Sequence, residues 1–277
     1  MAIAILASCT ANTSNEDAAK EEWIQLFNGK DMTGWTPKIV GYPAGENFKN
    51  TFRVEDGSLA SSYDEYETFN DDFGHLFYKE KFSHYRLRVQ YRFVGEQVNN
   101  GPGWAYRNNG LMLHAQPVET MGLKQPFPIS LEMQLLAGSG SGERSTGNLC
   151  TPGTHVYLED SLFMPHCVSS TSKTYHGEQW VNAEAVVLGD SIIHHVVEGD
   201  TVLTYAKPTI GGGMEFANPE MMQEGKALDE GYITIQAESH PTQFKKIELL
   251  NLCGCMDPKA KNYKSYYIKD DRSKCKY

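Results

Sequence analysis

The sequence predicts an all-β protein, built as an antiparallel two-sheet sandwich with long loops at a cleft. Two observations favour this class: apolar and polar residues alternate with period two in many short segments, and Gly- or Asp-containing turns separate these segments. Scarcely any segment shows the 3.6-residue periodicity of an amphipathic helix. Many short strands in the near absence of helices are typical of a sandwich or jelly roll.

The strongest alternation lies in residues 85–93, where Tyr, Leu, Val, Tyr and Phe alternate with Arg and Gln. Further strands are predicted from the same pattern and from flanking turn residues at 52–54, 58–61, 75–78, 111–114, 129–135, 180–188, 191–197, 201–205, 233–237 and 244–251. Three stretches are predicted as long loops that border a cleft, namely 37–50, 136–154 and 207–228.

Composition limits the class of partner. The 277 residues include 40% hydrophobic and 22% charged residues, which is ordinary for a globular protein. A formal net charge of −10 argues against a nucleic-acid partner, because the chain repels phosphate backbones. It neither favours nor disfavours a neutral sugar. No apolar run reaches the roughly 18–20 residues that span a bilayer.

The N-terminus predicts a lipid anchor. Leu6-Ala7-Ser8-Cys9 resembles the lipobox of bacterial lipoproteins, in which the cysteine is acylated. We therefore expect lipidation at Cys9 and a location in the bacterial cell envelope, periplasm or outer membrane. The segment lacks a basic n-region, so we expect the full leader to begin upstream of Met1. The alternative is a chance apolar start on a cytosolic protein.

The five other cysteines favour disulfides. Cys150 and Cys167 flank a stretch that contains Gly and Pro, and Cys255 and Cys275 bracket a short polar tail. No C-x-x-C pair is present, so a zinc ribbon or thioredoxin-type motif is unsupported. Disulfides in an oxidising compartment explain the pattern better, and they leave Cys253 over.

Several blocks carry a family resemblance. The opening run Leu26-Phe-Asn-Gly-Lys-Asp-Met-Thr-Gly-Trp35 is followed, in order, by further blocks at 52–59, 109–111, 130–134, 180–199 and 231–247. Together they resemble the 3-keto-disaccharide hydrolase domain family over about residues 23–252. Lys245-Lys246 stand where the family has Arg-Asn and Leu111 where it has Ile, which puts any carry-over at the lysines in doubt.

The resemblance implies a concanavalin-A-like jelly roll in an exported, often lipid-anchored protein. The implied activity is hydrolysis of glycosides whose sugar is oxidised to a ketone at C3. We divide the chain accordingly into a leader remnant and polar tether (1–22), the jelly-roll domain (23–252) and a Cys-bounded tail (253–277).

Two predicted strands offer paired carboxylates. Glu132 and Gln134 lie two apart on one strand, and Gln236 and Glu238 repeat the arrangement on another. If these strands are close in the sheet, both carboxylates face one solvent-open groove, as general acid and base chemistry on a glycoside requires. Ordinary solvated acids on an outer face are the alternative.

A ketone at C3 acidifies the C2–H, which suggests a mechanism other than direct displacement. A base abstracts that proton, the C1 substituent leaves by elimination, and water adds across the double bond. We assign the base to Glu132 or Glu238, and polarisation of the oxygen to His114 or His155. A divalent cation is the alternative to histidine.

Sugar-binding candidates complete the site. Trp104 and Tyr106 can stack on the apolar face of a sugar ring, and Arg107 can hold a substrate oxygen or pair with a nearby acid. Asn109 belongs to a family block. His194 and His195 are adjacent on a strand and point to opposite faces, so one is a core histidine; we place His195 among the substrate-binding residues.

The tail offers a calcium alternative. Its oxygen-bearing residues are Asp257, Asn262, Asp270 and Asp271, in a spacing unlike an EF-hand loop. A solvated tail closed by a disulfide is the default, and we assign no cofactor with certainty.

The leading function is a glycoside hydrolase of the 3-keto type with a small oligosaccharide or glycoside as substrate. A carbohydrate-binding protein without catalysis is the runner-up, because the same fold hosts lectins. A structural surface protein is a third alternative.

Overall fold

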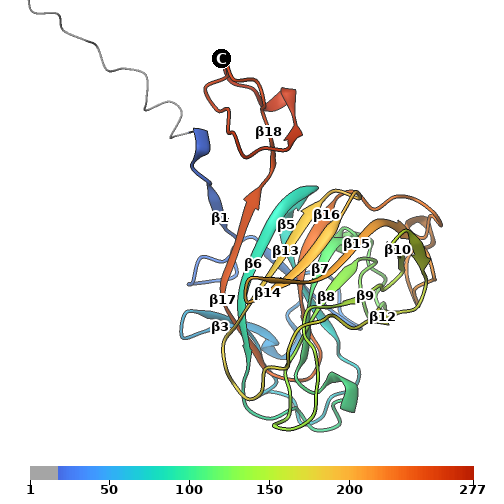
Figure 1. The fold of residues 1–277 in the computed structure, drawn as a ribbon. Coiled ribbons are helices and arrows are strands. Elements are labelled where there is room, and N and C mark those ends of the chain that lie inside the picture. Colours follow the sequence, from blue (N-terminus) through green and yellow to red (C-terminus); the bar gives the residue numbers. More distant parts are fainter. Residues whose placement is uncertain (1–17) are drawn as a thin grey trace, which may run out of the picture.

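The computed structural model describes residues 18–277 (Figure 1). Two antiparallel sheets pack face to face, so the predicted all-β sandwich, a concanavalin-A-like jelly roll, is confirmed. Apart from helical residues at 18–19, the helical elements within residues 18–277 are short 3₁₀ turns: η1 (Phe48–Asn50), η2 (Gly103–Ala105), η3 (Val118–Thr120), η4 (Pro219–Met221) and η5 (Arg272–Lys274). No helix within residues 18–277 has the length and apolar character to cross a bilayer.

The larger sheet has ten strands. In spatial order they are β11 (Ser161–Phe163), β10 (Thr154–Leu158), β15 (Asp200–Ile210), β14 (Ile193–Val197), β13 (Val181–Leu188), β6 (His84–Phe93), β17 (Thr242–Asn251), β4 (Ser58–Ser61) and β3 (Phe52–Glu55), with β1 (Trp23–Gln25) also paired to β17. β6 and β17 form the middle of this sheet. β1 pairs with residues 248–250 of β17 (Figure 1).

The smaller sheet has seven strands and carries the candidate site. Its order is β12 (Cys167–Val168), β9 (Asn148–Cys150), β8 (Leu131–Leu136), β7 (Asn108–Ala115), β16 (Gly231–Ala237), β5 (Gly74–Phe82) and β2 (Trp35–Ile39). β8 and β16, which carry the predicted acidic side chains, are both hydrogen-bonded to β7. The condition that the two strands lie close in one sheet is therefore met.

The core lies between the two sheets, as the alternation predicts. Every second residue of β6 is buried, from Tyr85 to Phe93, and these side chains pack against Leu131, Met133 and Leu135 of β8 in one cluster. The residues between them on β8 therefore point to the outer face of the smaller sheet. Burial of this apolar area supplies the main driving force for folding.

Three predicted loops contain strands. β2 runs through Pro37, β9 lies within 136–154, and β15 continues to Ile210 through Pro208. β2 is an edge strand, where proline is tolerated because its missing N–H costs no ladder hydrogen bond. β9 has only three residues, too few for an alternation to identify.

The opening motif is structural. Asn28 accepts hydrogen bonds from the backbone N–H groups of Lys30 and Asp31, and Asp31 accepts one from Thr33 N–H. The indole of Trp35 is buried and donates to the carbonyl of Leu26. The opening motif therefore shapes a turn at the start of the sandwich.

A loop covers part of the outer face of the smaller sheet. Residues 116–129 are braced by buried Gln125, whose amide donates to the Gln116 side chain and the Phe127 carbonyl. Met121 of this loop packs on Met112 of β7 in a second apolar cluster. One part of the outer face is thus filled by hydrophobic packing, and the polar residues occupy the rest.

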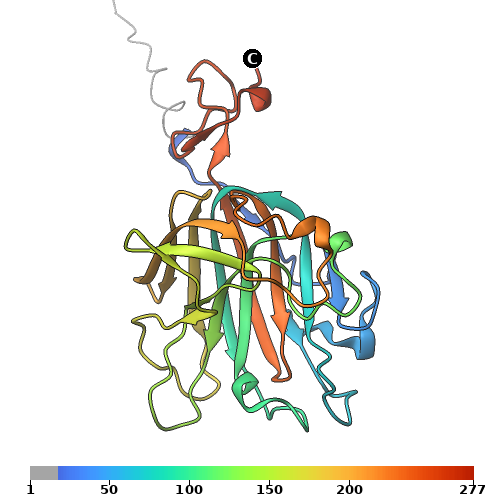
Figure 2. The same cartoon turned by 90° about the vertical axis from the view of Figure 1, so that its right-hand side faces the viewer.

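The tail, residues 253–277, projects from one end of the sandwich beside the N-terminal segment (Figures 1 and 2). β18 (Cys253–Gly254) and β19 (Lys269–Asp270) pair in parallel within it. The two predicted disulfides are present, with S–S bonds between Cys150 and Cys167 and between Cys255 and Cys275. Cys253 is free, as expected.

Candidate functional site

Polar side chains form a continuous band across the outer face of the smaller sheet. The register places Glu132 of β8 opposite Met112 of β7, and Gln236 of β16 opposite His75 of β5. Glu238 follows the last residue of β16 and lies two positions after Gln236, so its side chain points to the same face. We call this band the carboxylate face; its members are Lys38, His75, Asn108, Glu132, Gln134, Gln236 and Glu238.

The carboxylate face holds an unusual concentration of polar atoms without hydrogen bonds. Within the described residues, buried side-chain atoms lack a partner at His75 Nε2, Asn108 Oδ1, Glu132 Oε1, Glu238 Oε2 and both amide atoms of Gln236. An unsatisfied buried polar group costs about 1–3 kcal/mol. Several on one face indicate a place where a polar ligand or ordered water supplies the missing partners.

Both carboxyl groups are buried and influence each other. Glu132 is 6% exposed and Glu238 is 2% exposed. Burial raises the pKa of Glu132 from 4.5 to about 8. Burial, and then the negative charge of Glu132, raise the pKa of Glu238 well above its usual value, while Arg144 acts in the opposite direction. Two such groups near neutral pH hold at least one proton between them.

Gly110 provides space above β7 for side chains from β8 and β16. It lies on β7, and a Cβ at this position would stand 2.6 Å from Glu132 Oε1 and 3.0 Å from Gln236 Oε1. Only a residue without a side chain therefore lets the Glu132 carboxylate and the Gln236 amide approach each other across β7. The arrangement places two oxygens without hydrogen-bond partners, one from Glu132 and one from Gln236, over the same backbone.

Cationic and aromatic groups line one end of the carboxylate face. Arg144 donates to the backbone carbonyls of Tyr106 and Ala137, which fixes its position near Glu238. His240 is fully buried against the Tyr106 ring, 5.1 Å between centroids, and neither ring nitrogen has a partner. Burial, then the positive charges of Arg107 and Arg144, lower the pKa of His240 to about 4, so it is neutral at physiological pH.

An aromatic wall adjoins the same end. Trp104 is 55% exposed and stacks on Phe73, with centroids 5.7 Å apart, and Phe73 contacts Phe127. Phe127 in turn packs edge-on against His75 of the carboxylate face. Phe73 and Phe127 also line a pocket of about 680 Å³, which has Tyr42 among its other walls. This pocket provides space for a ring-shaped ligand, and it adjoins the carboxylate face only through the contact of Phe127 with His75.

The predicted acid pair is brought together, but not in the open groove that we expected. Glu132, Glu238 and Gln236 share one face, and Gln134 accepts a hydrogen bond from Asn148 on the same sheet. The burial of both carboxyls corrects the expectation of a solvent-open site. Loop 116–129 and the aromatic wall, which sequence alternation does not reveal, cover this face.

The predicted stacking residues keep places near the site. Tyr106 contacts His240, and Trp104 belongs to the aromatic wall. Arg107 donates to the carbonyl of Gly138, so its guanidinium is held by backbone and not by an acid. Asn109 is fully buried and donates to the Gln236 carbonyl, so it braces two strands and does not face a ligand.

Three predicted histidines lie elsewhere. His114 is buried against Tyr85 of the other sheet, and burial lowers its pKa to about 4. His155 belongs to β10 of the larger sheet, and Gly211 packs over its ring. His195 is a satisfied core histidine, bonded to the Gly147 carbonyl and the Tyr205 hydroxyl. His114 and His155 line two separate pockets, and neither Glu132 nor Glu238 is among the walls of either, so the roles assigned to these histidines stay predictions.

The sequence analysis did not predict four residues that lie on or beside the carboxylate face. Lys38 and His75 come from strands whose pairing is non-local, and Asn108 lies one position before the asparagine that the family block suggested. Arg144 lies in a predicted loop without any motif. Only the strand alternation could have predicted one of these residues: Asn108, Gly110 and Met112 occupy alternate positions of one strand, so their side chains point to the same face.

Metal-ligand geometry occurs once within residues 18–277. Cys150, His166 and Cys167 present atoms within 4.8 Å of one another, but the two sulfurs are bonded to each other and leave one histidine. In the tail, Asp257 and Asp271 accept hydrogen bonds from neighbouring backbone N–H groups, and Asp270 pairs with Arg272. These oxygens serve separate turns, so they do not support the calcium alternative.

Comparison with known proteins gives one strong match. A family model described as a 3-keto-alpha-glucoside-1,2-lyase-like domain matches residues 22–250. Among curated proteins, none matches this sequence. The model covers the whole sandwich and stops before the tail.

Solved structures resemble the chain more distantly. A protein of Parabacteroides distasonis described as a candidate glycosyl hydrolase has 12% identity and a TM-score of 0.49, over 83% of this chain and 99% of its own. The carbohydrate-binding module CBM66 of Bacillus subtilis has 8% identity and a TM-score of 0.46, over 79% and 96%. LamA of Z. galactanivorans, in complex with laminaritriose and laminaritetraose, has 8% identity and a TM-score of 0.48, over 84% and 99%. At this level of similarity, the neighbours say nothing about what this chain binds or cleaves.

Proposed function

Because the chain belongs to the family of 3-keto-alpha-glucoside-1,2-lyase-like domains, we propose that it cleaves glycosides whose sugar carries a ketone at C3. The observation that carries the proposal is the pair of buried carboxyl groups on one face, surrounded by polar atoms that lack partners. A glycoside bound there would satisfy these atoms and stand between an acid and a base.

The proposed reaction begins at C2. The ionised carboxylate of the pair removes the C2 proton, and the electron pair of that C–H bond moves towards the C3 ketone as an enolate. The enolate then expels the C1 substituent to form a C1–C2 double bond, and the protonated carboxyl gives its proton to the leaving oxygen. Addition of water, with OH to C1 and H to C2, completes a net hydrolysis.

Glu132 suits the base role better than an ordinary carboxylate does. A base with a pKa of about 8 has a stronger drive to take a carbon-bound proton than one of 4.5. Gln236 suits the oxyanion role, because neither atom of its buried side-chain amide has a partner and this amide lies across Gly110 from Glu132. This assignment replaces the histidines of the sequence-based scheme.

Turnover of matched substrates tests the proposal. The protein is incubated with a disaccharide and with its 3-keto derivative, and reducing-sugar release is followed in D₂O by NMR. Cleavage of the oxidised substrate alone, with deuterium incorporated at C2, supports the elimination route. Equal cleavage of both substrates, or cleavage without deuterium at C2, rejects it.

Two variants assign the roles. Glu132→Gln should lower kcat by about 10²–10⁴-fold, the range of a general base. Glu184→Gln is the matched control, because Glu184 pairs with Arg86 and Arg88 on the other sheet, and it should keep full activity. An active Glu132→Gln variant would remove Glu132 from the mechanism.

A carbohydrate-binding protein without catalysis is the second candidate. The burial of both carboxyls favours it, because a substrate must reach groups that are 6% and 2% exposed. Saturable binding of an unoxidised sugar at the exposed Trp104, with no turnover of either substrate, would establish this function.

Export and lipid anchoring remain part of the proposal. Two disulfides suit an oxidising compartment. Cys9, the proposed acylation site, lies outside the described residues. Incorporation of labelled fatty acid into the natural chain, and its loss in Cys9→Ser, would test the anchor.

A further inference from the structure

The tail carries charge of the opposite sign to the rest of the chain. Residues 253–277 contain 7 basic and 3 acidic residues, whereas residues 1–252 contain 18 basic and 32 acidic residues. A net charge of +4 in the tail thus stands against −14 in the remainder. Such asymmetry indicates a surface with its own electrostatic partner.

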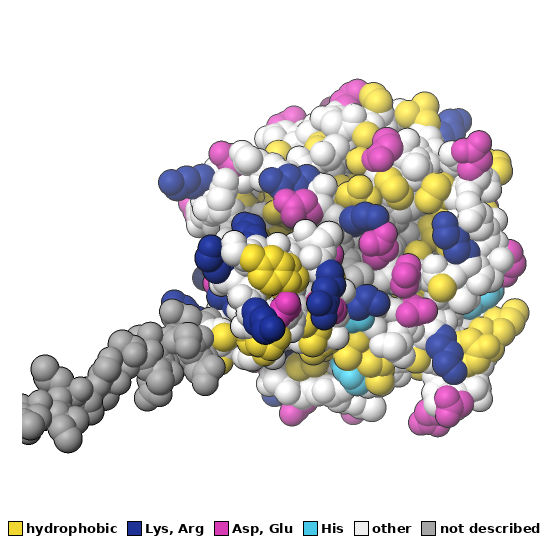
Figure 3. Space-filling model, turned by 90° about the horizontal axis from the view of Figure 1, so that it is seen from above, with side chains coloured by type: hydrophobic (Ala, Val, Ile, Leu, Met, Phe, Trp, Pro, Cys, Tyr) yellow, Lys and Arg dark blue, Asp and Glu magenta, His cyan; other side chains and the backbone are white. Residues whose placement is uncertain are grey.

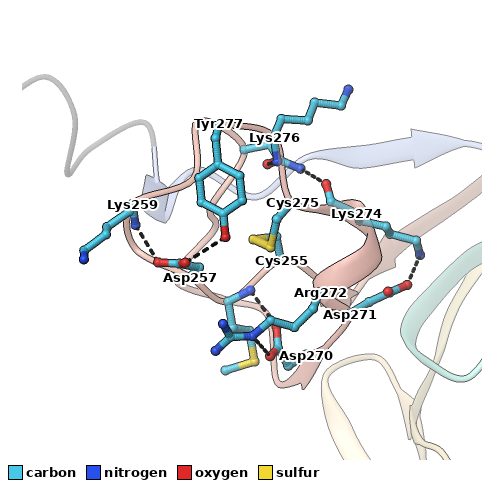
Figure 4. The surroundings of a disulfide bond; sticks show 12 residues. Cys255, Asp257, Lys259, Asp270, Asp271, Arg272, Lys274, Cys275, Lys276 and Tyr277 are labelled. Carbon is cyan, nitrogen blue, oxygen red and sulfur yellow. Dashed lines mark hydrogen bonds and ion pairs between the residues drawn. A yellow bond between two sulfur atoms is a disulfide. The ribbon is translucent and has the colours of Figure 1, made fainter.

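Most of the tail's cations are unneutralised. Arg272 and Lys274 form ion pairs with Asp270 and Asp271. The remaining exposed lysines take part in no ion pair within the described part of the chain; they are Lys259, Lys261, Lys269 and Lys276. Figure 4 shows the side chains of Lys259 and Lys276 extending away from the tail. An anion approaching this end therefore meets free ammonium groups.

Apolar side chains are exposed on the same small unit. Met256 is 39% exposed, Ile268 is 51% exposed and Tyr277 is 70% exposed. Exposed apolar groups among lysines are typical of segments that bind at a lipid interface, where the headgroups meet the cations and the acyl boundary meets the apolar groups. A purely electrostatic partner such as an anionic polysaccharide offers the aliphatic side chains of Met256 and Ile268 no acyl layer to enter.

The tail is held in one shape and at one end of the molecule. The Cys255–Cys275 disulfide closes it (Figure 4). The Asn262 side chain also donates across it to the Lys274 carbonyl. Ser265 donates its backbone N–H to the Ala18 carbonyl, so the tail contacts the chain where the described residues begin. Seen from above, Lys and Arg side chains gather towards the left of the described part of the molecule (Figure 3).

We propose that residues 253–277 form a docking surface for an anionic lipid membrane. The exposed lysines contact the headgroups, and Ile268 and its exposed apolar neighbours enter the interface. The acidic sandwich is then held off the surface, with its N-terminal end towards the membrane. This surface acts independently of the proposed catalysis and of any acyl chain on Cys9.

Vesicle sedimentation of the full chain carrying Cys9→Ser tests the docking surface. One set of vesicles is pure phosphatidylcholine and the other contains one third phosphatidylglycerol. We expect binding to the anionic vesicles alone, weakened as salt rises from about 0.05 to 0.5 M because screening shortens the range of attraction. Equal binding to both vesicles, or none to either, overturns the proposal.

Two fourfold variants of equal charge separate the tail from overall charge. Lys259→Gln, Lys261→Gln, Lys269→Gln and Lys276→Gln together should weaken partitioning by about fivefold per lysine. The control replaces four exposed sandwich lysines with Gln, namely Lys30, Lys79, Lys207 and Lys226. We expect it to bind as the parent does, and equal losses in the two variants would contradict a dedicated surface.

Ile268→Ser tests the apolar part, and we expect it to remove the binding that persists at high salt. A soluble anionic polysaccharide serves as the competing partner. Binding to that polymer with no binding to anionic vesicles would show that the tail recognises a polyanion other than a membrane, which rejects the proposal.

Discussion

Replacing Glu132 by Gln is expected to stabilise the fold at neutral pH while it lowers the rate of cleavage. The side chain is 6% exposed and one carboxylate oxygen lacks a partner, so the folded protein disfavours its charged form. Gln has nearly the same shape and carries no charge at any pH. The variant therefore removes the cost of ionisation without opening a cavity.

The size of the effect follows from the pKa. The folded-state pKa of Glu132 is about 8 against 4.5 for the unfolded chain, so the unfolded chain releases this proton first. The stability that the protonated form contributes is complete below pH 4.5 and is lost as pH rises through 8. Linkage gives a loss of about 3 kcal/mol by pH 7. Glu238 adds to it in the same direction, because its pKa is also raised.

Urea unfolding followed by tryptophan fluorescence at about pH 5, 7 and 8.5 measures the free energy of unfolding. The natural chain should lose stability from pH 5 upwards, and Glu132→Gln should flatten the profile and exceed the parent by about 3 kcal/mol at neutral pH. Glu184→Gln, which breaks partly exposed ion pairs, should instead lose up to about 1 kcal/mol. A Glu132→Gln variant no more stable than the parent at pH 8.5 would refute the reasoning.

Three further predictions follow from the structure. Gly110→Ala places a methyl group 2.6 Å from a Glu132 oxygen, so it should displace the base and lower turnover of the 3-keto substrate by about 10²-fold. Gly103→Ala is the control: a Cβ there meets no atom within 4 Å, so kcat should be unchanged in the same assay. Cys150→Ser breaks a disulfide that closes a 17-residue separation beside the carboxylate face; urea unfolding should show a loss of about 2–4 kcal/mol, and an unchanged midpoint would contradict it. His195→Ala leaves two buried partners unsatisfied, so it should cost about 2–4 kcal/mol of stability by the same measurement, with sugar affinity unaltered by calorimetry.

The candidate site was predictable in part. Alternation on β8 and β16 placed Glu132 and Gln236 on the outer face, because side-chain direction along a strand is local and has period two. The places of His114 and His195 were not predictable in this way. Both lie on strands, but whether the face of a strand meets the core or a ligand depends on the neighbouring strands and the other sheet. His75 entered the site only through the pairing of β5 with β16.

The sequence by itself determined the sandwich class and most strand positions, because both depend on local periodicity, and it favoured disulfides among the cysteines without settling their pairing. Only the tertiary structure decided that Glu132 and Glu238 are buried together and that Asn108 faces them in place of Asn109. Strand register and the path of loop 116–129 set those outcomes. Both arise from contacts between residues far apart in the chain, which no local pattern records.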